Sequence, residues 1–243
     1  MKISVTSDVH IRESNPEARV YLENFLKNPK VQNSDYIIFL GDIFDLMVGA
    51  KKQYLKEFDF FFLAIKKMAE EGRKIIYIEG NHDFHLEDVF KKINSSQIKV
   101  IRTNYELEDK GKRIRFEHGD ELDLYNKSYK RWKKIYSSSL MGFLLKFIFP
   151  YWMIRGVGNR ASTNSKKQSS RTFSLEFEKK KYRENFKKYS QANVDIFVMG
   201  HTHIQDHYEF NGKVYLNNGY PPAHNQYIYI ENGQWQFLSA LDS

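Results

Sequence analysis

The chain has 243 residues, of which 41% are hydrophobic and 16% aromatic, so it can bury a substantial core and is not a disordered polypeptide. It contains no cysteine, which excludes disulfide bonds and thiolate metal ligands and fits a reducing compartment. The first residues lack the apolar run and cleavage site of a signal peptide. We therefore expect one cytoplasmic domain spanning residues 1–243.

The first 80 residues alternate between expected strands and helices. Each expected strand is a short run of β-branched or aromatic residues, and the second and third end near Gly41 and Gly80. The strands are Lys2–Thr6, Asp35–Leu40 and Lys74–Ile78, and the helices are Pro16–Leu26 and Tyr54–Ala69. This order is typical of a layered α/β sheet.

The middle of the chain changes from strand-like runs between Gln97 and His118 to a basic, helix-compatible stretch over Lys127–Ser190. Residues 125–190 hold 17 Lys or Arg and three Asp or Glu, a net charge of +14 within a chain of net charge +8. We expect a helical cap inserted at about residues 125–190. Its charge indicates an anionic partner such as phosphate, nucleic acid or anionic lipid, and a solvated helical face is the alternative.

Strands are expected again after Asp195. Asn-Gly pairs at 211–212 and 232–233 are strong hairpin signals between them. The expected strands are Ile196–Met199, Gln205–Phe210, Val214–Asn217, Gln226–Ile230 and Trp235–Leu238.

Five short motifs rich in Asp, His and Asn follow expected strands. Ligands in α/β sheets bind at the carboxyl ends of strands, so these motifs are expected to converge. Alternation along an extended segment places Asp8 with His10, and His201 with His203, on one side. The motifs are Asp8-Val-His10, Gly41-Asp42, Gly80-Asn-His-Asp83, His118-Gly-Asp120 and Gly200-His-Thr-His203.

Carboxylate, imidazole and amide ligands together suit manganese, iron or zinc. A carboxylate can bridge two ions, and Asp42 is the candidate. Two divalent ions about 3.5–4 Å apart can promote displacement at phosphorus, so phosphoester hydrolysis is the expected reaction. Any one motif alone could be a turn or a helix cap, but five in order favour a metal site.

These motifs resemble those of the calcineurin-like metallophosphoesterase superfamily, in the same order, from residue 8 to 203. The resemblance implies an α/β fold, a four-layered α/β/β/α sandwich, with two divalent metal ions, Mn²⁺ first and Fe or Zn as alternatives. One ion would be held by Asp8, His10, Asp42 and His203. The other would be held by Asp42, Asn81, His118 and His201. His82 matches the catalytic histidine of the superfamily, Asp83 is placed to orient it, and Asp45 supports the site or is a turn residue.

Within that superfamily the chain most resembles the UDP-2,3-diacylglucosamine pyrophosphatases of lipid A synthesis, which carry a basic helical cap after the His-Gly-Asp motif. Tyr129 follows His118-Gly-Asp at a similar offset to a tyrosine of that branch. The chain departs from the branch at His82, where the branch has arginine, at Tyr125-Asn126, where it has paired aspartates, and at Lys133, which falls near a cap arginine.

The cap supplies the candidate substrate-binding residues and the most apolar segment of the chain, Leu140–Ile154. That segment is too short to span a bilayer, which takes about 20 residues. It could line a pocket for acyl chains, dip into a membrane surface, or pack the cap onto the body. The candidate substrate-binding residues are Tyr129, Lys133, Arg155, Arg160, Lys166 and Lys167.

Three functional hypotheses follow. The first is an enzyme that hydrolyses the pyrophosphate bond of a nucleotide-linked lipid, such as UDP-2,3-diacylglucosamine, to lipid phosphate and UMP, peripheral on the inner membrane face through its cap. The second keeps the enzyme class with another phosphoester: a soluble nucleotide, a phosphoprotein or a nucleic acid. The third is a non-catalytic scaffold binding a partner, nucleic acid included, through the basic cap. It is disfavoured because every expected ligand is present.

Overall fold

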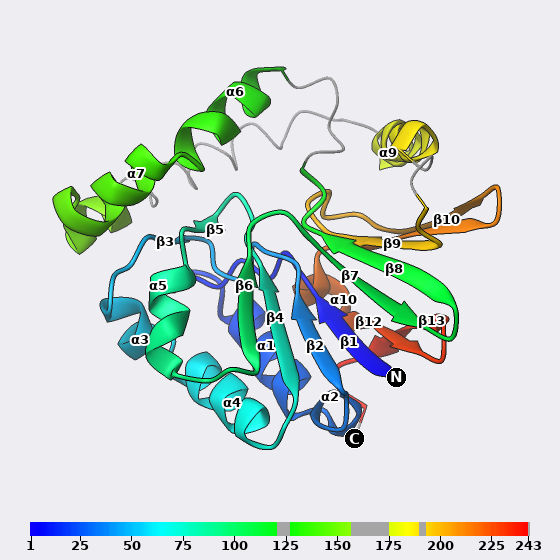
Figure 1. Ribbon diagram of the computed structural model, residues 1–243, viewed down its shortest axis with the longest axis horizontal. Helices are drawn as coiled ribbons and strands as arrows, with labels where there is room; N and C mark the ends of the chain where they lie inside the picture. Colours follow the sequence, from blue (N-terminus) through cyan, green and yellow to red (C-terminus); the bar gives the residue numbers. More distant parts are fainter. Residues whose placement is uncertain (121–126, 157–174, 190–192, 243) are drawn as a thin grey trace.

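The computed structural model of the protein describes residues 1–120, 127–156, 175–189 and 193–242. Two sheets face each other, with helices on both outer faces (Figure 1). The six-stranded sheet runs in the order β13 (Gln234–Ser239), β12 (Gln226–Glu231), β1 (Lys2–Thr6), β2 (Tyr36–Phe39), β4 (Lys74–Ile78) and β6 (Ile98–Ile101). The five-stranded sheet runs β10 (Gln205–Phe210), β11 (Lys213–Asn218), β9 (Ile196–Met199), β8 (Lys112–Glu117) and β7 (Asn104–Asp109).

The helices of the first half cover the six-stranded sheet. They are α1 (Pro16–Lys27), α2 (Pro29–Gln32), α3 (Gln53–Glu57), α4 (Asp59–Glu70) and α5 (Glu87–Phe90), which continues into the 3₁₀ turn η1 (Lys91–Ile93). A small parallel pair, β3 (Met47–Val48) and β5 (Asp83–Phe84), lies beside them. Later helices are α6 (Lys127–Tyr136), α7 (Ser139–Phe143), the π-helical turn η3 (Leu144–Ile148), a helix at residues 151–156, α9 (Leu175–Tyr189) and α10 (Pro221–His224).

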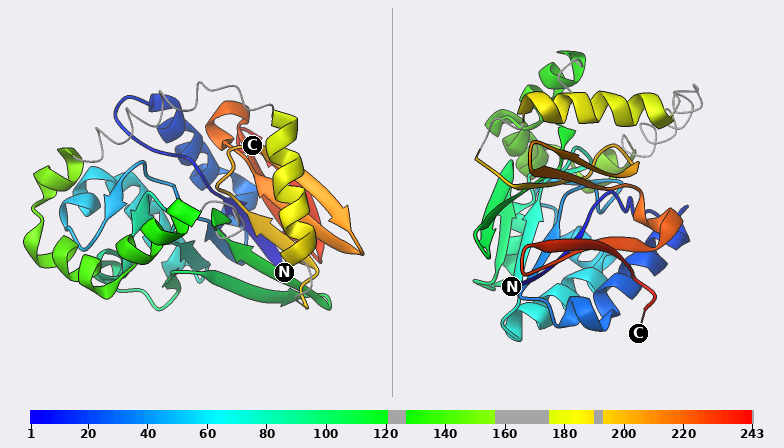
Figure 2. Two further views of the ribbon diagram at one scale, coloured as in Figure 1. Left: turned by 90° about the horizontal axis from the view of Figure 1, so that it is seen from above. Right: turned by 90° about the vertical axis from the view of Figure 1, so that its right-hand side faces the viewer.

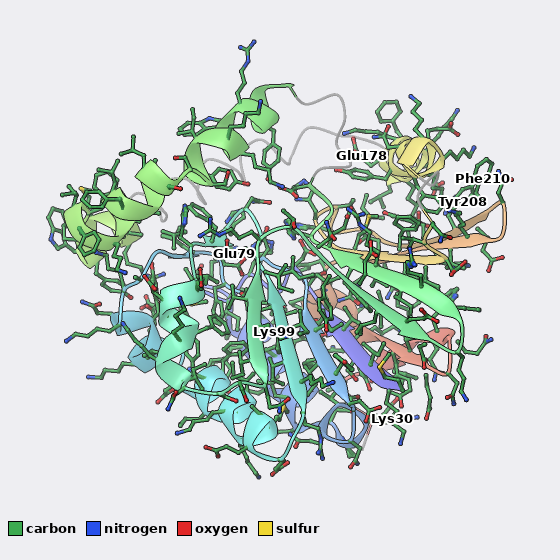
Figure 3. All side chains as sticks on the ribbon, viewed as in Figure 1. Lys30, Glu79, Lys99, Glu178, Tyr208 and Phe210 are labelled. Carbon is green, nitrogen blue, oxygen red and sulfur yellow. The ribbon has the colours of Figure 1, made fainter. Side chains whose placement is uncertain are left out.

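Three apolar clusters separate four layers. The first lies between the six-stranded sheet and the first-half helices, the second between the sheets, and the third between α9 and the five-stranded sheet. Phe186 of α9 is fully buried in the third cluster, against Phe197 and Tyr215. Tyr208 and Phe210 of β10 also pack there, beneath α9 (Figure 3). Figure 2 shows the same stacking from the side. The predicted α/β/β/α sandwich is therefore confirmed.

Strand alternation explains how one sheet serves two of these layers. In β2, Ile37 and Phe39 join the first cluster, whereas Ile38 joins the second, because successive side chains point to opposite faces. Strand β1 pairs with β2 in parallel and with β12 in antiparallel orientation. Strands β2 and β4 are also parallel, so β1, β2 and β4 all end at the same edge of the sheet.

The predicted helix Tyr54–Ala69 is interrupted at Phe58, where α3 ends and α4 begins. Phe58 has φ −116° and ψ 36°, which are not helical values. Its ring is buried against Phe44 at a centroid distance of 4.3 Å. The contact of Phe58 with the core therefore accompanies a break that the apolar spacing did not reveal.

The described cap residues 127–156 pack on the body through one face and expose the other. Leu145 and Ile154 are buried against Val48, and Lys146 binds Asp88 at 2.6 Å. The opposite face presents large apolar side chains to solvent: Leu140, Phe143, Phe147, Ile148 and Trp152, each more than half exposed. None of the helices within the described ranges is long and apolar enough to cross a membrane.

The later part of the predicted insertion, residues 175–189, does not pack with residues 127–156 but on the five-stranded sheet. Helix α9 covers the five-stranded sheet on the opposite side of the molecule from α7 (Figure 1). Arg183 of α9 is joined to Asp206 of β10 by an ion pair of 2.5 Å. Residues 175–189 thus form the fourth layer, and the domain boundaries at about 125 and 190 stay a prediction.

Candidate metal centre

The candidate ligands stand on loops that leave the carboxyl ends of strands in both sheets. In the six-stranded sheet these loops follow β1, β2 and β4, and in the other sheet they follow β8 and β9. The loops are tied to each other: Asp8 N–H donates to Gly41 O at 3.1 Å and Gly200 N–H to His118 O at 3.0 Å. The structure therefore brings together all seven residues predicted as metal ligands: Asp8, His10, Asp42, Asn81, His118, His201 and His203.

The backbone at these ligands is unusual. Asp8, His10, Asp42, His201 and His203 all have φ between 49° and 69°, the left-handed region that non-glycine residues rarely adopt. Each such residue costs about 1–3 kcal/mol, so the surrounding structure must enforce it. Strain gathered on five of seven candidate ligands indicates a functional site.

Two glycines allow the loops to approach closely. A Cβ atom at Gly80 would lie 2.2 Å from Asp42 Oδ1, and one at Gly200 would lie 2.2 Å from Asp8 Oδ2. No side chain fits at either position. The glycines of the Gly-Asn-His-Asp and Gly-His-Thr-His motifs are therefore needed for packing against the carboxylates of the neighbouring loops.

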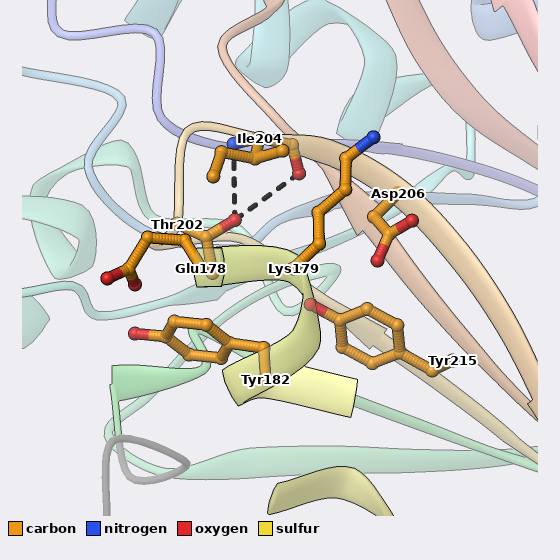
Figure 4. A pocket seen from close by; sticks show the side chains of 7 residues that line it. All are labelled: Glu178, Lys179, Tyr182, Thr202, Ile204, Asp206 and Tyr215. Carbon is orange, nitrogen blue, oxygen red and sulfur yellow. Dashed lines mark hydrogen bonds between the residues drawn. The ribbon is translucent and has the colours of Figure 1, made fainter. Parts of the chain in front are cut away.

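Thr202, which stands between the two histidines of the Gly-His-Thr-His motif, lies beside α9. Its hydroxyl accepts from Ile204 N at 3.1 Å, and Glu178 and Tyr182 of α9 lie beside it (Figure 4). This contact closes the loop on itself.

One group of donors comprises His118, Asn81 and His201. His118 Nδ1 donates to Leu40 O at 2.7 Å, so in the neutral ring Nε2 carries a lone pair. That Nε2 lies 3.1 Å from Asn81 Oδ1 and 3.2 Å from His201 Nδ1, and Asn81 Oδ1 lies 3.1 Å from His201 Nδ1. Lone pairs this close require a shared proton or cation, and the contact to Leu40 orients the ring as carbonyls orient metal-binding histidines.

The other group comprises Asp8, His10 and His203, whose ligand atoms lie within 4.8 Å of one another. His10 Nε2 and His203 Nε2 are 3.0 Å apart, and His203 Nε2 is 3.5 Å from Asp8 Oδ1. Asp42 lies between the groups, because its Oδ2 is 3.9 Å from His10 Nε2 and 3.6 Å from His118 Nε2. Asp42 is thus in reach of both groups, and the Asp8 carboxylate also lies within 4.8 Å of Asp42 and His118.

The electrostatics of the two groups favour a cation. Burial alone would raise the pKa of Asp42, but the neighbouring imidazoles, His118 first, hold it below its ordinary range. Burial lowers the pKa of His118, but Asp42 and Asp8 outweigh it and raise the pKa to about 9. Partial desolvation among the ligand loops, and then the nearby His10, lower the pKa of His203, so its ring is neutral at pH 7 and offers a lone pair. The carboxylates thus favour positive charge at His118, a position that a divalent transition metal bound to the same donors would also satisfy.

His82 and Asp83, predicted as a catalytic pair, do not contact each other as expected. The Asp83 carboxylate is fully buried and accepts from Asp42 N, Ile43 N and Gly80 N at 2.8–2.9 Å, and from the Tyr77 hydroxyl. The predicted orienting role of Asp83 is therefore wrong, since Asp83 fixes the backbone of the Asp42 loop. Burial, followed by the nearby Asp42 charge, raises the pKa of Asp83 to about 7.

The partner of His82 is Asp45. His82 Nδ1 lies 2.9 Å from the carbonyl oxygen of Asp45, a contact that requires a proton on Nδ1. The ring is 34% exposed, so Nε2 remains available at the open side of the centre. The Asp45 carboxylate also binds Arg12 at 3.3 Å and lies 3.7 Å from His10 Nδ1. Asp45 therefore supports two residues of the site.

The residues predicted to bind substrate are dispersed. Tyr129 and Lys133 of α6 both bind Asp120, at 2.7 and 2.9 Å, and the Tyr129 ring lies 5.9 Å from that of His201. Arg155 instead pairs with Glu57 of α3 at 2.7 Å, which anchors the cap. Arg160, Lys166 and Lys167 lie outside the described residues. The use of Asp120 as the docking point of α6 was not predicted, although its place two residues after His118 could have indicated it.

The metal-free protein should bind two Mn²⁺ ions per chain, which isothermal titration calorimetry can measure. Asp42→Asn removes the charge that both groups share. We expect it to weaken both sites by more than the roughly 10–100-fold that loss of an outer hydrogen bond costs. Glu209→Gln, on the exposed part of β10, is the matched control. Unchanged titration of Asp42→Asn would contradict the assignment.

Comparisons with known proteins identify the family to which this chain belongs. Residues 1–205 match the model of the calcineurin-like phosphoesterase family. The UDP-2,3-diacylglucosamine hydrolase of Psychromonas ingrahamii is 24% identical over 84% of this chain and 81% of that protein, and that of Wigglesworthia glossinidia brevipalpis is 28% identical over 84% and 80%. A solved archaeal phosphodiesterase is 15% identical, covering 98% of this chain and 99% of that one, with a TM-score of 0.48. With the family model matching most of its length, this chain belongs to the calcineurin-like phosphoesterases and is a hydrolase.

Proposed function

We propose that the protein hydrolyses the pyrophosphate bond of a nucleotide-linked lipid of the UDP-2,3-diacylglucosamine type, with water, to UMP and a lipid phosphate. The observation that carries this proposal is the position of the cap, whose α6 contacts the candidate centre through Tyr129 while the adjoining segment exposes an apolar face. Family membership supports phosphoester hydrolysis. The names of the relatives support the substrate.

We assign one cation to Asp8, His10 and His203 and the other to Asn81, His118 and His201, with Asp42 shared between them. Bound cations would supply Lewis acidity toward the phosphate oxygens. The carboxylates and imidazoles of this chain are held in fixed positions by the surrounding loops, so little reorganisation is needed during the reaction. Mn²⁺ is the ion proposed, with Fe or Zn as alternatives that the same donors accept.

His82 is the proposed proton donor to the leaving oxygen. The carbonyl of Asp45 keeps one proton on Nδ1, so the second ring nitrogen is the atom that faces substrate and gives or shares a proton. A histidine can stabilise the departing phosphate in this way without binding a cation itself. The related branch has arginine at this position, and an arginine side chain does not transfer a proton. His82 therefore also supports a second candidate function, the cleavage of other phosphoesters.

His82→Ala should lower kcat by about 10²-fold, the usual contribution of general acid catalysis. Mn²⁺ stoichiometry should stay at the wild-type value, because His82 is not assigned as a ligand. His85→Ala, three residues along and bonded to Tyr136 O on α6, is the control for a histidine outside the proposed chemistry. Loss of a metal ion in His82→Ala would show that His82 is a ligand.

The substrate can be decided with three compounds offered to the Mn²⁺-loaded protein: UDP-2,3-diacylglucosamine in micelles, UDP-N-acetylglucosamine and bis(p-nitrophenyl) phosphate. We expect UMP release from the acylated compound with the highest kcat/KM. Equal or faster turnover of the two lipid-free compounds would instead favour a soluble phosphoester. Chromatographic quantification of UMP and nitrophenol provides the measurement.

The exposed apolar face of the cap is the proposed contact with the lipid surface, which places the protein at the periphery of a membrane. Residues 127–156 contain seven Lys or Arg and no Asp or Glu. Basic side chains beside exposed aromatic ones suit an anionic interface. The cap thus offers the charge and the apolar area that such binding needs.

Phe147→Ser combined with Trp152→Ser should reduce sedimentation with phosphatidylglycerol vesicles by about tenfold or more, because burying each large apolar side chain contributes roughly 1.5–3 kcal/mol. These side chains are 63% and 75% exposed. Leu63→Ser is the control, since Leu63 on α4 is 65% exposed away from the cap. Equal sedimentation of all variants would reject this face as the membrane contact.

A further inference from the structure

Asn15 stands at the N-terminal cap position of α1 but does not cap the helix. Its side chain makes no hydrogen bond to the first-turn amides, the usual role of asparagine there. Instead its Nδ2 donates to the hydroxyl of Tyr220 at 2.7 Å. Tyr220 is 205 residues away, in the loop between β11 and α10. The side chain of Asn15 therefore serves a long-range contact.

Tyr220 in turn lies against a candidate ligand. Its ring centroid is 5.9 Å from that of His203, with an angle of 31° between the planes. His203 has a side chain that is 49% exposed, whereas those of His10 and His118 are 10% and 2% exposed. An exposed imidazole is less restrained by packing than a buried one, so the Tyr220 ring limits how His203 can turn.

The end of strand β11, just before Tyr220, holds the other end of the His201–His203 segment. Asn217 is fully buried, and its Nδ2 donates to Gly200 O at 2.7 Å. Its Oδ1 accepts from Gly219 N at 2.9 Å. The end of β11 and the loop that follows it therefore contact the ligand segment both at Gly200, through Asn217, and at His203, through Tyr220.

Asn15 also belongs to the segment that carries His10. Asn15 N–H donates to Arg12 O at 3.0 Å, which closes a turn just after His10. His10 Nε2 and His203 Nε2 face each other at 3.0 Å. The bond between Asn15 and Tyr220 thus joins the segment of His10 to the support of His203.

We propose that Asn15 and Tyr220 are positioning residues that fix His203 relative to His10, and so set the affinity of the cation assigned to Asp8, His10 and His203. This inference rests on the metal assignment of the proposed function. Outer contacts of metal ligands typically contribute about 10–100-fold in affinity. The cation assigned to Asn81, His118 and His201 should be unaffected, because neither residue contacts that group among the described side chains.

Calorimetric titration of metal-free protein with Mn²⁺ tests the pair without reference to activity. Tyr220→Ala should weaken one of two sites by about 10–100-fold and leave the other at its wild-type affinity. Tyr220→Phe and Asn15→Ala should each show a smaller, similar loss. The double variant that combines Tyr220→Phe with Asn15→Ala should lose no more Mn²⁺ affinity than either single variant, because both substitutions remove the same hydrogen bond.

The control is Tyr208→Ala, a half-buried tyrosine of β10 that packs toward Phe186 of α9. It should titrate like the wild type. The melting temperature of metal-free Asn15→Ala should equal that of the wild type within about 2 °C, because no capping bond is lost and a change of 1 kcal/mol shifts it by about 2–4 °C in a chain of this size.

Wild-type affinity at both sites in Tyr220→Ala, or additive losses in the double variant, would overturn this proposal alone. Absence of Mn²⁺ binding by the wild-type protein would overturn the proposed function together with it. If Tyr220→Ala does not fold, the two milder substitutions decide the same question.

Discussion

The apolar layer between the two sheets is the constraint on which the candidate metal centre depends. Ile38 and Ile76 of one sheet pack there with Phe116 and Val198 of the other. Because these side chains fix the separation of the sheets, they also fix the distance between loops that leave β2 and β4 and loops that leave β8 and β9. Ligands separated by more than 100 residues along the chain can then meet at one edge of the two sheets.

Within that frame, hydrogen bonds from buried groups set the finer positions. Asp83 holds the Asp42 loop through three backbone amides, and the carbonyl of Leu40 holds the His118 ring. A buried carboxylate is costly unless its oxygens are satisfied, and Asp83 is satisfied by groups that would otherwise be unpaired at a strained turn. The hydrogen bonds of Asp83 thus stabilise the strained backbone at Asp42, and Asp83 itself is not assigned to a cation or to the substrate.

Much of this arrangement could be predicted from the residues alone. The strand Lys2–Thr6 and the late strand Ile196–Met199 have the predicted bounds, because short β-branched runs between polar ends have few alternatives. The ligand set could be named because its motifs follow strands in a known order. The α/β/β/α layering came from the family resemblance, and the three apolar clusters agree with it.

Other features depend on contacts that no local pattern encodes. The break at Phe58 accompanies a ring packed on Phe44, and the role of Asp83 depends on which amides a distant loop presents. Helix α9 is also rich in Lys and Arg, although it holds all three Glu of residues 125–190, and its place on the second sheet depends on the packing of Phe186 against Phe197 and Tyr215. The contact of Asn15 with Tyr220 was equally hidden, because asparagine before a helix predicts a cap.

The two histidines of the Gly-His-Thr-His motif face tyrosines from different parts of the molecule, Tyr129 from α6 beside His201 and Tyr220 from the body beside His203. The surroundings of the centre are consequently asymmetric. One half is completed by α6, which we propose to recognise substrate, and the other is completed by residues of the body. Replacement of the cap during evolution would thus change the surroundings of one assigned cation and leave those of the other unchanged. New substrate specificities could then arise without loss of the hydrolytic site.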